Sequence, residues 1–256
     1  MEAKNIEFGY GSTPLLHDLS TTIQRGKITT IIGPNGSGKS TLLGLLANQL
    51  EPKYGSIQMD GRELQQISAK EMAKKLATVY QQNHAPNDLT VERLISYGRS
   101  PYQGFFRNLD EDGEEIIEWA MEITNLKKMA KKRICELSGG ERQRAWIAMA
   151  LAQKTDILFL DEPTTYLDIY YQLEILRLVK RLNQEYGMTI VMVLHDINQA
   201  IQFSDELIIM KSGQILYQGA AETAITENRL EEVYGIRASV RWCEENQATY
   251  IVPLVI

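Results

Sequence analysis

Ile-Ile-Gly-Pro-Asn-Gly-Ser-Gly-Lys-Ser-Thr-Leu, residues 31–42, is the stretch that decides the fold of this 256-residue chain. It matches the phosphate-binding pattern G-x-x-x-x-G-K-[ST] at Gly33, Gly38, Lys39 and Ser40. The apolar, β-branched run 27–32 before it predicts a buried strand. A helical spacing of leucines follows, so we expect a helix from Leu42 to Leu50 that stops before Pro52. The order strand, loop, helix delivers a phosphate to the start of a helix, where N–H groups and the dipole favour an anion.

Each part of this loop has a chemical use. Glycines let successive backbone N–H groups point into one concavity. Lys39 adds a positive charge near the β- and γ-phosphates, and the Ser40 hydroxyl can ligate Mg²⁺. The predicted phosphate-binding residues are Gly33, Pro34, Asn35, Gly36, Ser37, Gly38, Lys39, Ser40 and Thr41.

The composition fits an ordinary globular protein, with 44% hydrophobic and 23% charged residues. The net charge of −6 argues against nucleic acid as a main partner. Cys135 and Cys243 are far apart in sequence, which favours a reducing compartment. No apolar run approaches the ~18 residues that a membrane span requires, so any role at a membrane should come through partners.

Strands and helices alternate along much of the chain. Apolar runs at 27–32, 76–80, 156–161 and 189–194 predict a mostly parallel sheet covered on both faces. Residues 4–8 and 19–23 alternate polar and apolar, which predicts half-buried strands. We expect one α/β domain with its core at 1–82 and 151–225, a helical subdomain at 83–150 and a short C-terminal extension at 226–256.

Polar residues follow three of the apolar runs, where an open parallel sheet binds its ligand. Asp161 is the candidate for Mg²⁺, and Glu162 is the candidate general base that polarises the attacking water. Gln81 can reach Mg²⁺ and the water through its amide, with Gln82 as the alternative. His195 is predicted to sense the γ-phosphate and orient the substrate. The catalytic candidates are therefore Glu162, His195 and Gln81, and the metal candidates are Ser40, Gln81 and Asp161.

A second helix start is predicted at Leu137-Ser-Gly-Gly-Glu-Arg-Gln143. Ser138 can cap the helix that continues through 145–152, and the two glycines allow close backbone approach. This is a second helix N-terminus that suits an anion.

These motifs together resemble the ATP-binding subunit of ABC transporters. The resemblance covers essentially the whole chain, and Leu-Ser-Gly-Gly-Glu is very specific to that class. It implies the ABC ATPase fold: a P-loop NTPase core, an N-terminal antiparallel β subdomain and a helical insertion. It also implies a homodimer that encloses two ATP molecules with Mg²⁺. Each ATP would lie between one copy's phosphate loop and the other copy's signature residues, which are Leu137, Ser138, Gly139, Gly140, Glu141 and Gln143.

The resemblance assigns further roles. Tyr10 would stack on adenine, Gln81 would be the Q-loop residue, and Leu167 and Asp168 would belong to the D-loop. Thr165 stands where many family members have serine, which leaves the hydrolysis assignment intact.

Segments 91–102 and 163–169 look like those of importers for iron–siderophore, haem and vitamin B12, with ferric siderophore as the first choice. This implies integral-membrane permease subunits, indirectly a substrate-binding lipoprotein or periplasmic protein, and a peripheral position on the cytoplasmic face of the membrane. The alternatives are a soluble nucleotide kinase, a non-transport ABC protein serving DNA repair or the ribosome, and a transporter for another substrate.

Overall fold

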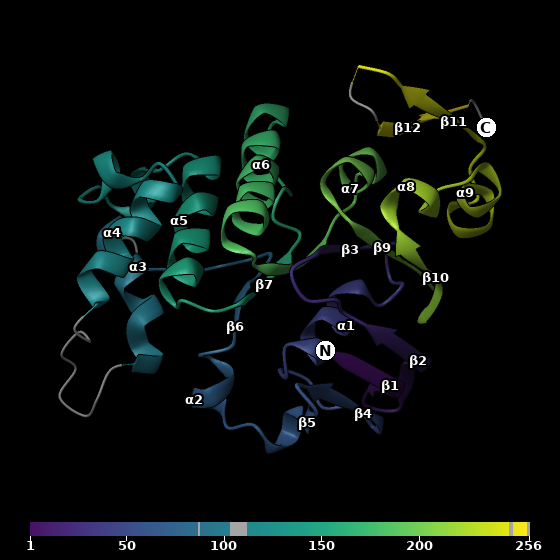
Figure 1. The fold of residues 1–256 in the computed structure, drawn as a ribbon, viewed down its shortest axis with the longest axis horizontal. Coiled ribbons are helices and arrows are strands. Elements are labelled where there is room, and N and C mark those ends of the chain that lie inside the picture. Colours follow the sequence, from purple (N-terminus) through teal and green to yellow (C-terminus); the bar gives the residue numbers. More distant parts are fainter. Residues whose placement is uncertain (87, 103–111, 246–247, 255–256) are drawn as a thin grey trace. The chain divides into compact units, whose positions relative to one another are not determined.

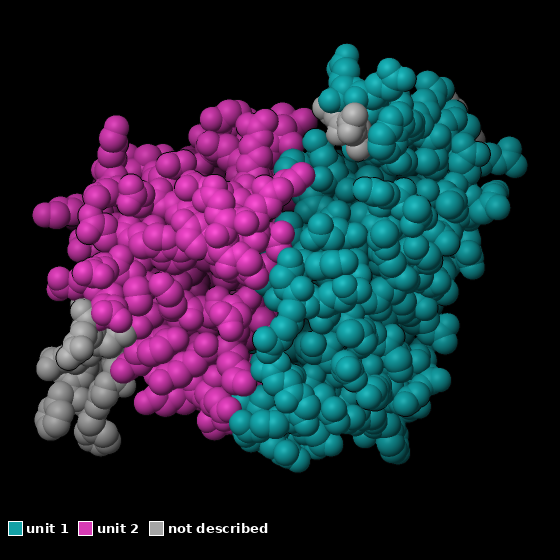
Figure 2. Space-filling view, viewed as in Figure 1, with its two compact units in different colours: residues 1–67, 189–256 teal, residues 68–188 magenta. Residues whose placement is uncertain are grey.

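The structure is a computed structural model that describes residues 1–86, 88–102, 112–245 and 248–254. The chain forms two compact units, coloured separately in Figure 2. Unit 1 comprises residues 1–67 and 189–256, and unit 2 comprises residues 68–188. Unit 2 thus contains the segment 83–150 together with strands and helices that flank it in sequence. The narrower boundaries drawn from the sequence stay a prediction.

An antiparallel sheet opens unit 1, in the strand order β2-β1-β4-β5. Its strands are β1 (Glu2–Tyr10), β2 (Thr13–Thr22), β4 (Tyr54–Met59) and β5 (Arg62–Glu63). Ile6 pairs with Leu19, and both side chains are buried. The alternation of polar and apolar residues in these segments therefore reflects a sheet with one buried face.

A second set of strands in unit 1 runs in the order β10-β9-β3-β8. These are β3 (Ile28–Ile32), β8 (Thr189–Val193), β9 (Glu206–Lys211) and β10 (Gln214–Ala220). Strand β3 pairs in parallel with both β8 and β9, and every residue of β3 and β8 is buried. Parallel strands covered on both faces require near-continuous apolar runs, which confirms the predicted α/β class.

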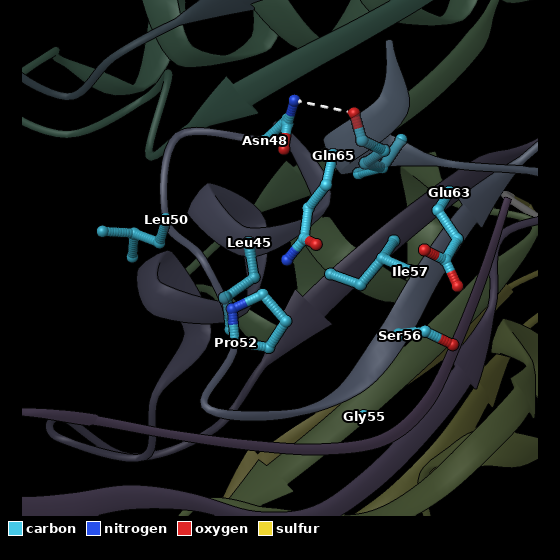
Figure 3. A pocket seen from close by; sticks show the side chains of 10 residues that line it. Leu45, Asn48, Leu50, Pro52, Gly55, Ser56, Ile57, Glu63 and Gln65 are labelled. Atoms are coloured by element: carbon cyan, nitrogen blue, oxygen red, sulfur yellow. Dashed lines mark hydrogen bonds between the residues drawn. The ribbon is translucent and has the colours of Figure 1, made fainter.

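The helix after the phosphate loop, α1 (Lys39–Leu46), differs from its predicted extent. It begins three residues earlier and ends four residues before Leu50. Asn48 adopts the left-handed conformation, with φ of 58°, and stops the helix well before Pro52. Its side-chain amide donates to the Leu64 carbonyl at 3.1 Å (Figure 3), beside a small pocket of about 70 Å³ that Leu45 also lines. Asparagine, not proline, is the stop signal.

From residue 197 on, the described part of unit 1 adds helices and a hairpin to its strands. It contains α7 (Ile197–Phe203), α8 (Ala221–Ala224), α9 (Glu227–Tyr234) and a hairpin of β11 (Ala238–Cys243) and β12 (Ala248–Pro253). The hairpin packs on α7 and α9 (Figure 1). These two strands are not predicted from the sequence.

Unit 2 pairs β6 (Leu76–Val79) in parallel with β7 (Ile157–Asp161). The short helix α2 (Ala69–Met72) precedes β6, and α6 (Ile169–Tyr186) follows β7. The described residues of 83–150 form helices as expected, chiefly α3 (Val91–Ser96), α4 (Gly113–Ile123) and α5 (Gly139–Ala152). The described helices include none long and apolar enough to cross a bilayer.

One buried cation stabilises the helical segment. Arg99 is 2% exposed, donates to the Ala152 carbonyl at 2.8 Å and lies over the ring of Tyr102. A buried charge needs such partners because desolvation is costly. Arg99 thereby connects the end of α5 to the chain that follows α3.

Candidate nucleotide site

The phosphate loop is held by contacts within unit 1. Gly33 lies so close to β9 that an added Cβ would stand 2.2 Å from the Met210 carbonyl oxygen, which only glycine avoids. The Ser37 carbonyl accepts from the Gly213 N–H at 3.1 Å. Lys39 is 6% exposed, and its ammonium donates to the carbonyls of Gly33 and Pro34, both at 3.0 Å. The lysine charge is therefore fixed over the loop.

The start of α1 is open. Its N-cap is Gly38 in the left-handed conformation, with φ of 98°, and no side chain caps the helix. Helix starts leave backbone N–H groups without intrahelical partners. Ser40 and Gly36 are exposed, whereas Thr41 is buried. This combination of N–H groups, a lysine and a hydroxyl is the chemistry of a phosphate cradle.

Two further predicted residues lie in unit 1. Tyr10 ends β1 and is 59% exposed, and its ring packs edge-on against Phe8 at 5.1 Å between centroids. An exposed, braced ring can stack on a nucleobase. His195 follows buried Leu194 at the end of β8 and is exposed. Asp196 caps α7 directly after it, accepting from the Gln199 N–H at 2.9 Å.

In unit 2, the structure brings Gln81 and Glu162 together. The Gln81 side-chain amide donates to Glu162 Oε2 at 2.5 Å, and the Thr165 hydroxyl donates to the same oxygen at 3.0 Å. Glu162 has a positive φ of 50°, which is uncommon for a non-glycine residue. Residues held in such sparsely populated conformations cluster at functional sites. Asp161 precedes it as the last, partly buried residue of β7. The carboxylate is therefore aimed by its backbone and by two donors.

The contact between Thr165 and Glu162 is not predicted from the sequence. Thr165 stands out there only as a departure from serine at the start of the D-loop, yet its hydroxyl donates to Glu162. The signal was present, because the pattern Glu-Pro-Thr-Thr places a hydroxyl three residues after the carboxylate within a turn. The Thr165 N–H donates to the Glu162 carbonyl at 3.2 Å and closes that turn.

The signature segment forms a complete capping box at the start of α5. Ser138 Oγ accepts from the Glu141 N–H at 3.3 Å, and the Glu141 carboxylate accepts from the Ser138 N–H at 2.8 Å. This backbone hydrogen bond lowers the pKa of Glu141 below its usual value. Ser138 and Gly139 are exposed, Gln143 is partly exposed, and Leu137 is buried beneath them.

The two glycines of this segment differ. A Cβ on Gly140 would lie 2.4 Å from the ring of Tyr171, on α6, whereas one on Gly139 would meet only Leu167, at 3.4 Å. Leu167 and Asp168 lead into α6, which Asp168 caps by accepting from the Tyr171 N–H at 3.1 Å. Gly140 is thus required by packing within the subunit, while Gly139 is left exposed.

Comparisons with known proteins agree with the ABC resemblance found in the sequence. Residues 16–165, more than half of the chain, match the family model for ABC transporters. The chain belongs to the ABC transporter family. Like other ATP-binding subunits of this family, it is an ATPase.

Individual ABC proteins are similar over most of the chain. The petrobactin import ATP-binding protein FpuC of Bacillus anthracis is 47% identical over 88% of this chain and 83% of its own length. The iron(3+)-hydroxamate import ATP-binding protein FhuC of Bacillus subtilis (strain 168) is 45% identical over 94% and 89%.

Solved ABC structures share the fold. An inward-facing metal-chelate type ABC transporter matches with a TM-score of 0.86 at 27% identity, covering 99% of this chain and 97% of that one. A dimeric post-hydrolysis ATP-binding cassette bound to ADP and Pi matches with a TM-score of 0.74 at 29% identity, covering 86% and 98%.

The ABC residues predicted from the sequence all lie within the described ranges. Unit 1 carries the phosphate loop, Tyr10 and His195, and unit 2 carries Gln81, Asp161, Glu162, the D-loop and the signature segment. Within each unit, the local geometry can serve the chemistry expected of that half. The individual roles remain predictions.

Proposed function

We propose that this chain is the ATP-hydrolysing subunit of a membrane importer for ferric siderophores. The similarity to FpuC and FhuC carries the proposal, because both are named for import of such iron chelates and both match over most of their length. The likeness to a metal-chelate type transporter supports the same cargo class. The two relatives are named for different chelates, so the proposal extends to the class and to no single siderophore.

We propose Glu162 as the residue that polarises the attacking water, with Gln81 and Thr165 orienting its carboxylate. The hydrogen bonds from both donors to one carboxylate oxygen support this role. The contact with Glu162 also favours Gln81 over Gln82 as the Q-loop residue. His195 would orient the γ-phosphate, and Tyr10 would stack on adenine.

Mg²⁺ would be held by Ser40, Gln81 and Asp161. Hydroxyl, amide and carboxylate oxygens are the hard ligands that Mg²⁺ prefers, and it usually completes its shell with phosphates and water. The described residues contain no group of three or more His, Cys, Asp or Glu side chains placed to hold a metal. When bound, Mg²⁺ would neutralise charge on the β- and γ-phosphates.

A homodimer would enclose two ATP molecules between phosphate loop and signature segment. The likeness to a dimeric cassette bound to ADP and Pi supports this assembly. So does the apolar surface at the D-loop, where Tyr166, Ile169 and Tyr170 are 87%, 73% and 63% exposed. Large exposed apolar side chains gathered on one segment mark interaction surfaces.

The membrane permease would dock on unit 2, which places the ATPase on the cytoplasmic face of the membrane. A cavity of about 200 Å³ lies between the loop after Gln81 (Asn83, His84, Ala85, Pro86) and the segment around the signature (Ile134, Cys135, Arg142, Trp146). A permease helix seated there would touch the loop that carries Gln81 and the helix that carries the signature. A substrate-binding lipoprotein or periplasmic protein would deliver the chelate to the permease.

Uptake measurements test this function. A deletion strain should lose uptake of radiolabelled ferric siderophore, regain it with the wild-type chain, and fail to regain it with the Glu162→Gln variant. The wild-type chain should also co-purify with an integral-membrane subunit. Unchanged ferric siderophore uptake across a panel of chelates, with loss of haem or vitamin B12 uptake instead, would reassign the cargo.

A further inference from the structure

The C-terminal hairpin is attached to the helix that begins beside His195. Asn198 is the second residue of α7, three residues after the histidine. Its side-chain amide donates to the Ile251 carbonyl at 3.3 Å, while its side-chain carbonyl accepts from the Ile251 N–H at 2.7 Å. One carboxamide thus binds both backbone groups of a single residue in β12.

The pairing of the hairpin explains why Asn198 fits there. Ile251 lies opposite Val240 in the β11–β12 ladder, and Asn198 satisfies its N–H and carbonyl. The Ile251 side chain is 8% exposed, and β12 packs along α7. An isolated two-stranded hairpin is marginally stable in water, so this one depends on what it packs against.

The same C-terminal segment also borders the phosphate loop. Val233, Tyr234 and Gly235, at the end of α9, line a cavity of about 400 Å³ together with residues 34–37 and 211–212. Lys211 donates to the Glu232 carbonyl within α9. The segment after β10 therefore borders the phosphate loop through α9 and contacts the helix after His195 through β12.

We propose that Asn198 is a positioning residue for ATP hydrolysis, which anchors the β11–β12 hairpin to α7 and thereby fixes His195. The first turn of α7 is held at two points, by the Asp196 cap and by the Asn198 clamp. Loss of the clamp lets this turn shift, and a misplaced orienting group slows the chemical step more than it weakens binding. The inference rests on the proposed role of His195.

The test compares Asn198→Ala with Asn183→Ala in the purified full-length chain with ATP and Mg²⁺. Asn183 is a matched control, because its carboxamide also donates to a backbone carbonyl, that of Met188 at 2.8 Å, but in unit 2. We expect Asn198→Ala to lower kcat about five- to tenfold with KM for ATP within about twofold, since ~1 kcal/mol corresponds to a factor of about five. Its His195 imidazole resonances should shift or broaden. Asn183→Ala should change the melting temperature without either effect.

A second variant tests the route through the hairpin. Ile251→Ala weakens the packing of β12 on α7, and if the hairpin acts through the clamp, the combination with Asn198→Ala should lower kcat by less than the product of the single effects. Unchanged kcat and unchanged His195 resonances in folded Asn198→Ala would overturn the inference, as would an equal loss of kcat in Asn183→Ala. If His195→Ala itself hydrolyses ATP normally, the proposed catalytic role of the histidine fails instead.

Discussion

The chain has two helix starts suited to a phosphate, and they are built in opposite ways. The α1 start has a glycine N-cap, no side-chain cap and no acidic residue in its first turn. The α5 start is closed by its own side chains, with Ser138 and Glu141 in a reciprocal capping box. An open cradle is ready for an anion on its own. At the closed start, the exposed Gly139 and the Ser138 hydroxyl, which can still donate its proton, are the groups a phosphate would meet.

This difference suggests a primary and a secondary contact. We expect the phosphate loop to supply most of the ATP affinity and the signature segment to join only when two subunits meet. Four variants test this division, beginning with the largest expected effect.

Glu162→Gln should give a stalled dimer in which the α1 start of one subunit and the α5 start of the other bind the same ATP. Removing a general base typically lowers a rate by about 10²–10⁴-fold, while the amide keeps the size of the side chain. We expect ATP affinity to persist, turnover to stall and a stable ATP-bound dimer to appear by size-exclusion chromatography. Normal hydrolysis by this variant would remove Glu162 from its proposed role.

Lys39→Ala should damage the open cradle. The loss of a charge-assisted hydrogen bond to phosphate should weaken ATP binding by at least ~1.5 kcal/mol, measured by titration calorimetry on the monomer. Wild-type affinity in this variant would contradict the assignment of the phosphate loop.

Ser138→Ala should separate stability from assembly at the closed start. The matched control is Ser68→Ala, because Ser68 caps α2 by accepting from the Glu71 N–H at 3.2 Å in the same way. Each change should destabilise by ~1 kcal/mol, read from chemical denaturation. In a Glu162→Gln background, only Ser138→Ala should abolish the ATP-bound dimer. Equal dimerisation of both variants would mean that Ser138 serves the helix alone.

The smallest effect is a pH dependence confined to the closed start. The Ser138 N–H holds the pKa of Glu141 below its usual value of 4.5. A carboxyl whose pKa is lowered by folding stabilises the native state above the unfolded pKa, and this stabilisation is lost as the pH falls through the folded pKa. Glu141→Gln should therefore flatten the loss of stability below about pH 4.5, measured by urea unfolding at several pH values. An unchanged acid limb would show that Glu141 contributes nothing to it.

The open and closed starts could both be predicted from sequence, because each depends on local chemistry. Glycine spacing, a serine cap and leucine periodicity are readable in order along the chain, and the buried strands follow from apolar runs. The predicted end of α1 at Leu50 was wrong, because the left-handed Asn48 ends the helix without the clear sequence signal that a proline gives. The β11–β12 hairpin was missed because its stability comes from packing on α7 and α9. The grip of Thr165 on Glu162 was missed because a single turn geometry decides it.

Gly140 has a consequence that extends beyond its own helix. A single methyl group at this position would press on the ring of Tyr171, whose backbone N–H is the one that Asp168 binds. Even the smallest replacement would thus act as a wedge between neighbouring helices and disturb the D-loop from behind. Of these two adjacent glycines, Gly140 is therefore needed for packing inside the subunit, whereas Gly139 is the one exposed to a binding partner.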